Sequence, residues 1–358
     1  MSQKTKASAS KKPSALAPAP VLRQAMLDTL PFRLAANAVI LLPAIPALLD
    51  HYVEGLCTTW ATLGRHFGQS ERERLRESLR TLLTEAFGHS ASSRLRLAYD
   101  TDPAPGTSLT WKASIVHATM EDEYGEWTRT RTDSLFGRYP DAKVMDLART
   151  LGAPQGVSIL DVGAGTGRNT LPLAREGFRV AALEVAPALI RILREATEEQ
   201  KLDVAIFEGN MLDPTLELGE RRYDMVFLSE VVSHFRNSTQ LRNVLERAVM
   251  LLVPGGKLLF NAFLPVSGYK PDDLARQISE VMWCKLFTRF ELAEAASGLP
   301  LVAIAEDNTL DYEREHLPAE QWPPTPWYED WCSGRNAFKL PAAKSPMAAR
   351  WLTYRKLA

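Results

Sequence analysis

The stretch ILDVGAGTGRN, from Ile159 to Asn169, decides the fold of this 358-residue chain. It opens as a short apolar strand and runs on into a helical pattern. Between the two, Gly163, Gly165 and Gly167 let the backbone turn tightly and approach a ligand where a Cβ atom would clash. An acid, Asp161, stands at the end of the strand, just before the glycines. The stretch therefore predicts a strand–turn–helix unit whose turn binds a ligand.

A second acid, Glu184, ends the next predicted strand, 21 positions after Gly163. This is close to the spacing of roughly 20 residues at which an acid reaches the ribose hydroxyls of a nucleoside. A carboxylate suits that task because it can accept hydrogen bonds from both hydroxyls. The two acids predict a site at the carboxyl ends of neighbouring strands.

Short apolar strands alternate with amphipathic helices from Val157 to the end of the chain. Pro187 stands at the start of one helix, and Gly177 stands at the end of another. The alternation predicts an α/β fold with a seven-stranded, mostly parallel sheet covered by helices on both faces. The predicted strands are VSILDV, FRVAALE, DVAIFEG, YDMVFLS, KLLFNAF, LPLVAIA and RWLTYRK.

The residues before this region predict a separate module of helices and a β-hairpin. Leu34–Leu49 is interpreted as a buried helix broken at its prolines. Ser70 with Glu73 has the pattern of a capping box, and Gly88 stands where that helix would end. Two alternating stretches around the turn PAPG predict the hairpin. The expected divisions are a disordered tail (1–20), the helical and hairpin module (21–120), a lid or connector (121–154) and the α/β domain (155–358).

Composition excludes several classes of function. The net charge of −1 gives no overall field that would attract nucleic acid or an anionic membrane. The three scattered cysteines suit neither a disulfide framework nor a metal site, and they fit a reducing cytoplasm. The most apolar stretch is interrupted by prolines and is shorter than a membrane-spanning helix. The sequence thus predicts a cytoplasmic protein without a bound metal, and it gives no indication of the oligomeric state.

The stretch from Asp161 to Gly167 resembles motif I of the class I S-adenosylmethionine (SAM) dependent methyltransferases, which have a Rossmann-like fold. Four further features follow in the order of that family. They are Glu184, the loop Glu208–Asp213, the strand and loop Tyr223–Phe235, and the turn Leu252–Leu258. The resemblance extends over about residues 155 to 306 and the last strand, and it implies SAM as the cofactor. The residues that it assigns to the cofactor are Asp161, Gly163, Gly165, Gly167, Glu184, Asn210, Met211 and Ser229.

One position departs from the family pattern. Asn210 replaces the acid that usually follows the glycine of the adenine-binding loop. The amide oxygen of asparagine can still accept a hydrogen bond from the adenine amino group. Asp213 is the alternative partner for that group.

The main rival interpretation is a dinucleotide-dependent oxidoreductase. Its fingerprint is G-x-G-x-x-G, whereas the sixth position here is Arg168. An acid at position 161 would also face a pyrophosphate unfavourably, while SAM offers a cationic amino group nearby. Both features favour the methyltransferase.

Methyl transfer from a sulfonium needs a base only when the acceptor must lose a proton. His234 and Glu230 follow the fourth strand and are the candidates for catalysis. His234 is the candidate general base, and Glu230 is a candidate either for lining the SAM site or for orienting the acceptor. The alternative for His234 is a role in fixing the loop.

Two aromatic segments are expected to enclose the acceptor. One is Ala118–Pro140, a position that often forms a lid in related methyltransferases, and it carries Tyr124 and Trp127. The other is an insertion at 308–338 with Tyr312 and Trp327. Their density favours a small apolar or aromatic acceptor of the natural-product type. A structural cap made of the same aromatic residues is the alternative, as are a peptide or protein methyltransferase and a non-catalytic binding protein with this fold.

Overall fold

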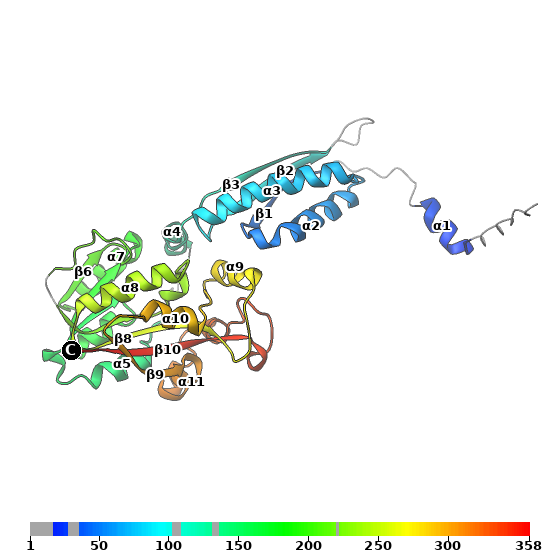
Figure 1. The fold of residues 1–358 in the computed structure, drawn as a ribbon. Helices are drawn as coiled ribbons and strands as arrows, with labels where there is room; N and C mark the ends of the chain where they lie inside the picture. Colours follow the sequence, from blue (N-terminus) through cyan, green and yellow to red (C-terminus); the bar gives the residue numbers. More distant parts are fainter. Residues whose placement is uncertain (1–16, 28–35, 102–108, 131–135, 220–221) are drawn as a thin grey trace, which may run out of the picture.

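The computed structural model describes residues 17–27, 36–101, 109–130, 136–219 and 222–358. Most of the predicted tail, residues 1–16, lies outside the described residues. Figure 1 shows an N-terminal module that projects from a larger α/β domain. Helix α1 (Ala19–Leu27) precedes the module and buries none of its side chains.

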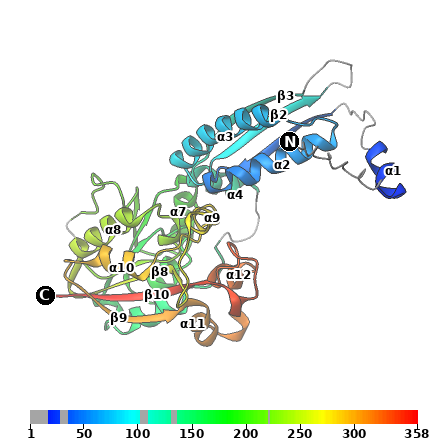
Figure 2. The same cartoon turned by 45° about the vertical axis from the view of Figure 1, so that its right-hand side comes forward.

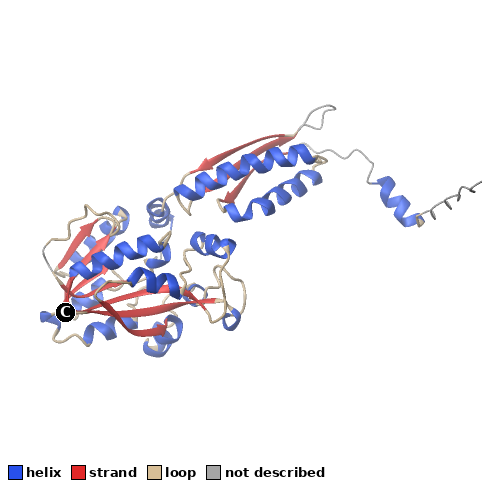
Figure 3. Cartoon of the chain, viewed as in Figure 1, coloured by secondary structure: helices blue, strands red, loops and turns tan. Residues whose placement is uncertain are grey.

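The N-terminal module is a three-stranded antiparallel sheet with two helices packed on one face (Figure 3). Its core gathers twelve buried residues, among them the fully buried Trp60, whose ring lies 4.9 Å from that of Phe67 between centroids. The predicted hairpin is confirmed as strands β2 and β3. The elements are β1 (Ala36–Pro43), η1 (Pro46–Leu48), α2 (Leu49–Thr62), α3 (Gln69–His89), β2 (Arg94–Thr101) and β3 (Thr110–Val116).

The prediction of a helix at Leu34–Leu49 is wrong, because Ala36–Pro43 forms strand β1 and pairs with β2. Ile40 and Leu42 pack against the module core, whereas Val39 and Leu41 are 48% and 61% exposed. Apolar residues therefore occupy both faces of the strand. The two-residue alternation that marks a half-buried strand is hidden in such a run, and length and prolines alone cannot identify it.

The ends of helix α3 also differ from the prediction. The N-cap is Gly68, which has no side chain to accept a hydrogen bond, and Glu71 Oε2 accepts from the Gly68 N–H at 2.9 Å. Ser70 and Glu73 lie inside the first turns. At the other end the helix continues through Gly88 to His89. The predicted capping box is therefore wrong, because the helix begins two residues earlier and its N-cap is a glycine.

The α/β domain contains a seven-stranded sheet in the order β6-β5-β4-β7-β8-β10-β9. The first five of these strands are parallel, and β10 runs antiparallel to both of its neighbours. All seven predicted strands are confirmed. They are β4 (Ser158–Val162), β5 (Arg179–Glu184), β6 (Val204–Glu208), β7 (Tyr223–Leu228), β8 (Leu252–Pro265), β9 (Leu301–Asn308) and β10 (Met347–Lys356).

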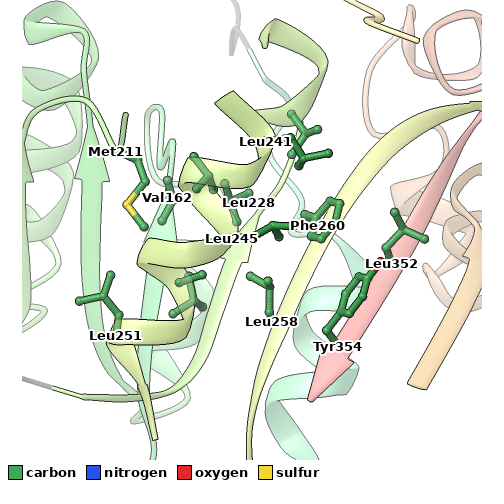
Figure 4. Packing of buried hydrophobic residues seen from close by; sticks show 14 of the residues in the cluster. Val162, Met211, Leu228, Leu241, Leu245, Leu251, Leu258, Phe260, Leu352 and Tyr354 are labelled. Atoms are coloured by element: carbon green, nitrogen blue, oxygen red, sulfur yellow. The ribbon is translucent and has the colours of Figure 1, made fainter. Parts of the chain in front are cut away.

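Alternate residues of the strands pack on opposite faces of this sheet. On one face, Leu160 and Leu258 join a core covered by helices α8 (Ser238–Leu251) and α10 (Arg289–Ala296), part of which is drawn in Figure 4. On the other face, Ile159 packs with helices α5 (Ala142–Arg149) and α6 (Thr170–Arg175). Helices therefore cover both faces, as predicted.

The remaining elements, apart from η2 at the start of β4, lie or begin near the edge of the sheet where the parallel strands end. Helix α7 begins with Pro187, as the sequence predicts, while α4 carries the predicted lid. The 308–338 insertion forms two short helices between β9 and β10. These elements are α4 (Met120–Thr130), η2 (Pro154–Gly156), α7 (Pro187–Glu199), η3 (Val232–His234), α9 (Asp273–Val281), α11 (Thr309–His316), η4 (Ala319–Gln321), α12 (Tyr328–Cys332) and η5 (Ala342–Lys344).

The N-terminal module contacts the α/β domain near helix α9 (Figure 2). The backbone N–H of Ala47 donates to Gln277 at 2.8 Å. The Arg236 guanidinium donates to the carbonyl of Phe87 at 2.5 Å, lies over the ring of Phe87 and pairs with Glu280 at 2.6 Å. The contact is thus polar and small. Among the described helices, none is both long and apolar enough to cross a membrane.

Candidate functional site

The largest group of predicted site residues lines a cavity of about 450 Å³ at the carboxyl ends of the parallel strands. The strand order reverses between β4 and β7, and open α/β sheets bind ligands at such a switch point. Of the eight predicted cofactor residues, six line this cavity. They are Asp161, Gly163, Gly165, Glu184, Asn210 and Ser229.

Glu184 is held by the backbone around it. One carboxylate oxygen accepts from the Gly165 N–H at 2.8 Å, and the other accepts from the N–H groups of Val185 and Ala186. Burial raises the pKa of Glu184 above its ordinary value, against the opposing effect of these hydrogen bonds. The carboxylate is therefore fixed at the end of β5, and its remaining lone pairs can accept from a ligand.

Asp161 is buried beneath the glycine turn. Its Oδ2 accepts a hydrogen bond from the Thr170 hydroxyl at 2.6 Å, which ties the end of β4 to the start of α6. Burial raises the pKa of Asp161 to about 7. A cationic group of a ligand would favour the ionised form of this carboxyl.

The three glycines of the turn have different surroundings. All three have positive φ, the backbone region that favours glycine. Gly163 and Gly165 line the cavity. Gly167 does not, because a Cβ atom there would meet Leu193 at 2.6 Å and Leu171 at 2.9 Å. Gly167 therefore serves the close packing of α6 and α7, and the structure does not bring it to the cavity.

The loop after β6 divides its residues between cavity and core. Asn210 lines the cavity, and its Oδ1 accepts from the Leu212 N–H at 2.9 Å. Met211 points the other way, into the core under α8, where Figure 4 shows it. Leu212 takes its place in the cavity wall. Asp213, the alternative to Asn210, is exposed and accepts from Thr215 instead.

A buried charge network joins the cavity to helix α5. Arg168 makes two hydrogen bonds with the Asp141 carboxylate, at 2.7 and 3.1 Å, and one with Glu230 Oε1 at 2.7 Å. Asp141 also accepts from the Ser229 hydroxyl at 2.6 Å and from Asn169. Burial disfavours the charged form of Arg168, but the two carboxylates outweigh it and raise its pKa. No local pattern in the sequence singles out Asp141, because only tertiary packing brings it to Arg168.

Glu230 has an unusual backbone. Its φ is 61°, a left-handed conformation that costs energy in a residue other than glycine, and its N–H donates to Asn261 at 2.8 Å. Burial raises the pKa of Glu230 to about 7, although Arg168 acts in the opposite direction. Strained backbone that persists in a cavity wall is characteristic of functional sites.

His234 lies opposite the lid helix. Its Nε2 is 3.4 Å from the Tyr124 hydroxyl. Burial lowers the pKa of His234 to about 4, so the imidazole is neutral at pH 7. Burial also raises the pKa of Tyr124, with Glu184 and Glu230 adding to the effect. The two side chains thus form a neutral pair.

A second cavity, of about 270 Å³, adjoins the first. Tyr124, Phe136, Glu230, His234 and Trp283 line both cavities. Trp127 and Trp327, predicted for the acceptor, line only the second one. The two aromatic segments therefore meet there.

Tyr312, the remaining residue predicted for the acceptor, lines neither cavity. It packs against the core beneath α5, stacks on His316 and donates to Asp146 at 3.0 Å. Helix α11 turns this side chain toward α5, so spacing along the insertion did not reveal its direction. We assign no acceptor contact to Tyr312.

Several residues that line the cavities were not predicted. Trp283, in the turn between α9 and α10, and Trp331 in α12 belong to the second cavity. The loop from His89 to Ser92, in the N-terminal module, forms part of the wall of the first. The insertion's tryptophan density was a signal for Trp331. No local pattern marks Trp283 or the loop, because only tertiary packing brings them to the site.

Comparison with known proteins gives the family of the central region. Residues 159–256 match the family model described as a methyltransferase domain. A demethylmenaquinone methyltransferase of Tropheryma whipplei is 29% identical over 116 residues, which cover 32% of this chain and 45% of that protein. A ubiquinone biosynthesis O-methyltransferase of Methylobacterium nodulans is 34% identical over 110 residues, 31% of this chain and 42% of that protein.

Among solved structures, a geranyl diphosphate C-methyltransferase of Streptomyces coelicolor A3(2) is similar with a TM-score of 0.48 and 16% identity, over 67% of this chain and 99% of that one. The chain spans less than half the length of the curated relatives named above. The match begins at Ile159, in the strand that carries Asp161, and ends at Gly256, within β8. Residues 159–256 of the chain therefore match a methyltransferase domain, as the resemblance of the glycine turn to the class I, SAM-dependent methyltransferases predicts.

Proposed function

We propose that this chain transfers a methyl group from SAM to a small acceptor that binds in the aromatic cavity. The observation that carries the proposal is the pair of adjoining cavities. The larger one lies at the glycine turn and has the strand-end acids, and the smaller one is lined mainly by aromatic rings. The wall that they share is where a methyl donor and an acceptor would meet.

The charge of the larger cavity fits SAM. Five carboxylates and two guanidinium groups line it. SAM carries a sulfonium and an amino group against one carboxylate, so an acidic surplus favours it electrostatically. By the resemblance to the class I methyltransferases, Glu184 would accept hydrogen bonds from the ribose hydroxyls of SAM. The acidic cavity would attract the amino group of SAM. Glycine is required at position 163 of this wall, because a Cβ atom there would meet Val231 at 2.3 Å.

When bound, SAM supplies an electrophilic methyl group. The chain's own residues position the reacting groups and exclude water from the site. Tyr124 and Phe136 cover the shared wall, and a Cβ atom on Gly165 would already touch Phe136 at 3.3 Å. Excluding water there strengthens the polar contacts of the site. Tyr124, Glu230 and His234 are the polar groups at the junction that can hold or accept a proton.

Calorimetric titration with SAM, with S-adenosylhomocysteine and with NAD⁺ tests the donor. We expect saturable binding of the first two and none of the third. SAM labelled in its methyl group, incubated with the chain and a cell extract, then tests the transfer. Label in small molecules would support the proposal. Label in precipitated protein would favour a protein acceptor, and binding without transfer would favour a non-catalytic protein.

A Trp327→Ala variant should lower turnover at least 10-fold while leaving SAM affinity within about twofold. The reason is that Trp327 lines only the aromatic cavity, so the acceptor loses apolar contact while the cofactor cavity is intact. Steady-state kinetics with the acceptor and a SAM titration measure the two effects. Trp322→Ala is the matched control, because Trp322 belongs to the same insertion and is partly buried but lines neither cavity. Equal losses in the two variants would support the structural cap.

Removing residues 1–116 should weaken SAM binding by about 10-fold, equal to about 1.4 kcal/mol. The hydrophobic core of the N-terminal module consists only of residues of that module, so we expect the α/β domain to stay folded without it. The cavity would lose the wall formed by His89–Ser92 and admit water. Calorimetry on the truncated chain measures the effect. Removal of residues 1–27 is the control and should change nothing, since α1 has no buried residue. Unchanged affinity after the longer deletion would show that the module does not take part in the site.

A further inference from the structure

The smaller cavity is lined by six aromatic side chains from four separate parts of the chain. Tryptophan dominates, and the rings pack against one another. Trp127 and Trp283 lie 4.7 Å apart between centroids, and Tyr124 and Trp127 lie 5.7 Å apart. The six residues are Tyr124, Trp127, Phe136, Trp283, Trp327 and Trp331.

The charged side chains that line this cavity carry only negative charge. Of its described lining residues, none is lysine or arginine, and Glu230 is the one carboxylate. His234, also in the wall, is neutral at pH 7 because burial lowers its pKa to about 4. An apolar ligand alone would not need a carboxylate in its wall, because a buried charge costs free energy unless it is paired.

The ion pair of Glu230 with Arg168 does not neutralise both carboxylates of the buried network. Arg168 faces Glu230 through Oε1, but the same guanidinium makes two hydrogen bonds with Asp141. The three groups together carry one net negative charge when both acids are ionised. Within the described part of the chain, no donor engages Glu230 Oε2. This oxygen is free to meet a ligand.

The backbone holds the cavity wall in a strained shape. Glu230 and Trp283 have φ of 61° and 54°, and both line the cavity. Side chains other than glycine occupy this region at a cost, typically of about 1–3 kcal/mol. The Trp283 carbonyl accepts from the Trp331 indole N–H at 3.0 Å, which fixes the strained turn against α12. The fold thus maintains a costly arrangement that places a carboxylate beside tryptophan rings.

We propose that the smaller cavity binds an organic ammonium ion, so that the acceptor of the proposed methyl transfer is a small amine. Aromatic faces attract cations through their negative quadrupole, tryptophan most strongly, and the attraction grows when the site excludes water. The Glu230 carboxylate supplies the charge partner. The inference rests on the proposed function only in taking this cation for the acceptor.

The step that follows balances with the groups named. Glu230 Oε2 accepts a proton from the bound ammonium, which frees the lone pair of the nitrogen. The nitrogen forms a bond with the methyl carbon as the bond from that carbon to sulfur breaks. The electron pair of the broken bond goes to sulfur, and the products are the methylated ammonium ion, S-adenosylhomocysteine and the protonated Glu230 carboxyl.

The test compares benzylamine, a cation at pH 7, with benzyl alcohol, a neutral molecule of nearly the same shape. The full chain is first saturated with S-adenosylhomocysteine, so that the larger cavity is filled. Each probe is then titrated while tryptophan fluorescence is recorded. We expect benzylamine to bind at least 10-fold more tightly. Equal affinities, binding of neither probe, or displacement of S-adenosylhomocysteine by benzylamine would each overturn the inference.

Three variants test whether the preference for benzylamine arises in the smaller cavity. Glu230→Gln keeps the shape of the side chain and removes its charge, and it should reduce the preference for benzylamine to below about threefold. Trp127→Leu keeps an apolar wall and should weaken benzylamine binding more than benzyl alcohol binding. Trp322→Ala should retain the full preference. A preference that survives both cavity variants would place the cation elsewhere.

Failure of this inference can be told from failure of the proposed function. Saturation with S-adenosylhomocysteine is itself the first measurement. If it binds and the ammonium preference is absent, the donor site stands and the acceptor is not an amine. If it does not bind, the proposed methyl transfer fails before any probe is added.

Discussion

A Glu184→Ala variant should bind SAM about 100-fold more weakly than the unaltered chain. Hydrogen bonds to charged groups contribute about 1.5–3 kcal/mol each, and 1.4 kcal/mol is tenfold in affinity. The variant loses the carboxylate that would meet the ribose. It also leaves the N–H groups of Gly165, Val185 and Ala186 without their acceptor, which loosens the glycine turn. Calorimetry measures the affinity, and circular dichroism confirms that the variant is folded.

Glu208 offers a matched control for this experiment. It ends strand β6 directly opposite Glu184 in the register, but its side chain is exposed and does not line the cavity. Glu208→Ala should therefore leave SAM affinity within about twofold. If Glu184→Ala bound SAM as tightly as this control does, the cofactor site would have to lie elsewhere.

An Arg168→Met variant should lose about 3–5 kcal/mol of folding free energy, the usual cost of removing one partner from a buried ion pair. The side chain of Arg168 is 7% exposed, and its removal leaves the Asp141 and Glu230 carboxylates facing each other without a cation. Urea unfolding followed by fluorescence measures the loss. A loss below about 1 kcal/mol would mean that the network is open to water.

The loss of folding free energy in the Arg168→Met variant should grow as pH rises. Burial already raises the pKa of Glu230 to about 7, and removing Arg168 removes a group that lowers it. A carboxyl whose pKa is higher in the folded state than in the unfolded state favours folding at low pH, and this contribution disappears as pH rises through the folded-state value. The variant should therefore be closer to the unaltered chain at pH 5.5 than at pH 8. The opposite trend would contradict the assignment of the buried charge.

Arg149→Met is the control for the charge network. Arg149 also pairs with two acids, Glu176 at 2.6 Å and Asp146 at 3.5 Å, but its side chain is 55% exposed. Exposed ion pairs contribute about 0–1 kcal/mol, because solvent screens them. Comparing the two arginines separates the effect of burial from the effect of losing a cation.

Local sequence was sufficient to predict the strands of the α/β domain and the alternation of strands with helices. Each of its strands is an apolar run bounded by glycine, proline or polar residues, and Pro187 begins its helix as expected. The same reasoning failed at β1, where the apolar run has no alternation to read. It also misplaced the ends of α3 by a few residues, since several residues near each end can serve as caps.

The sequence by itself determined the glycine turn, the acids Asp161 and Glu184 and the positions of the seven strands along the chain. All of these depend on contacts within one strand–turn–helix unit, or on a spacing that such units repeat. Only the tertiary structure decided which side chains meet at the junction of the cavities. Ser229 reaches Asp141 across 88 positions, and Tyr124 reaches His234 across 110. It also turned Met211, Gly167 and Tyr312 away from the cavities and brought in Trp283. The packing of the whole domain sets the positions of these residues, and no periodicity within a short window records that packing.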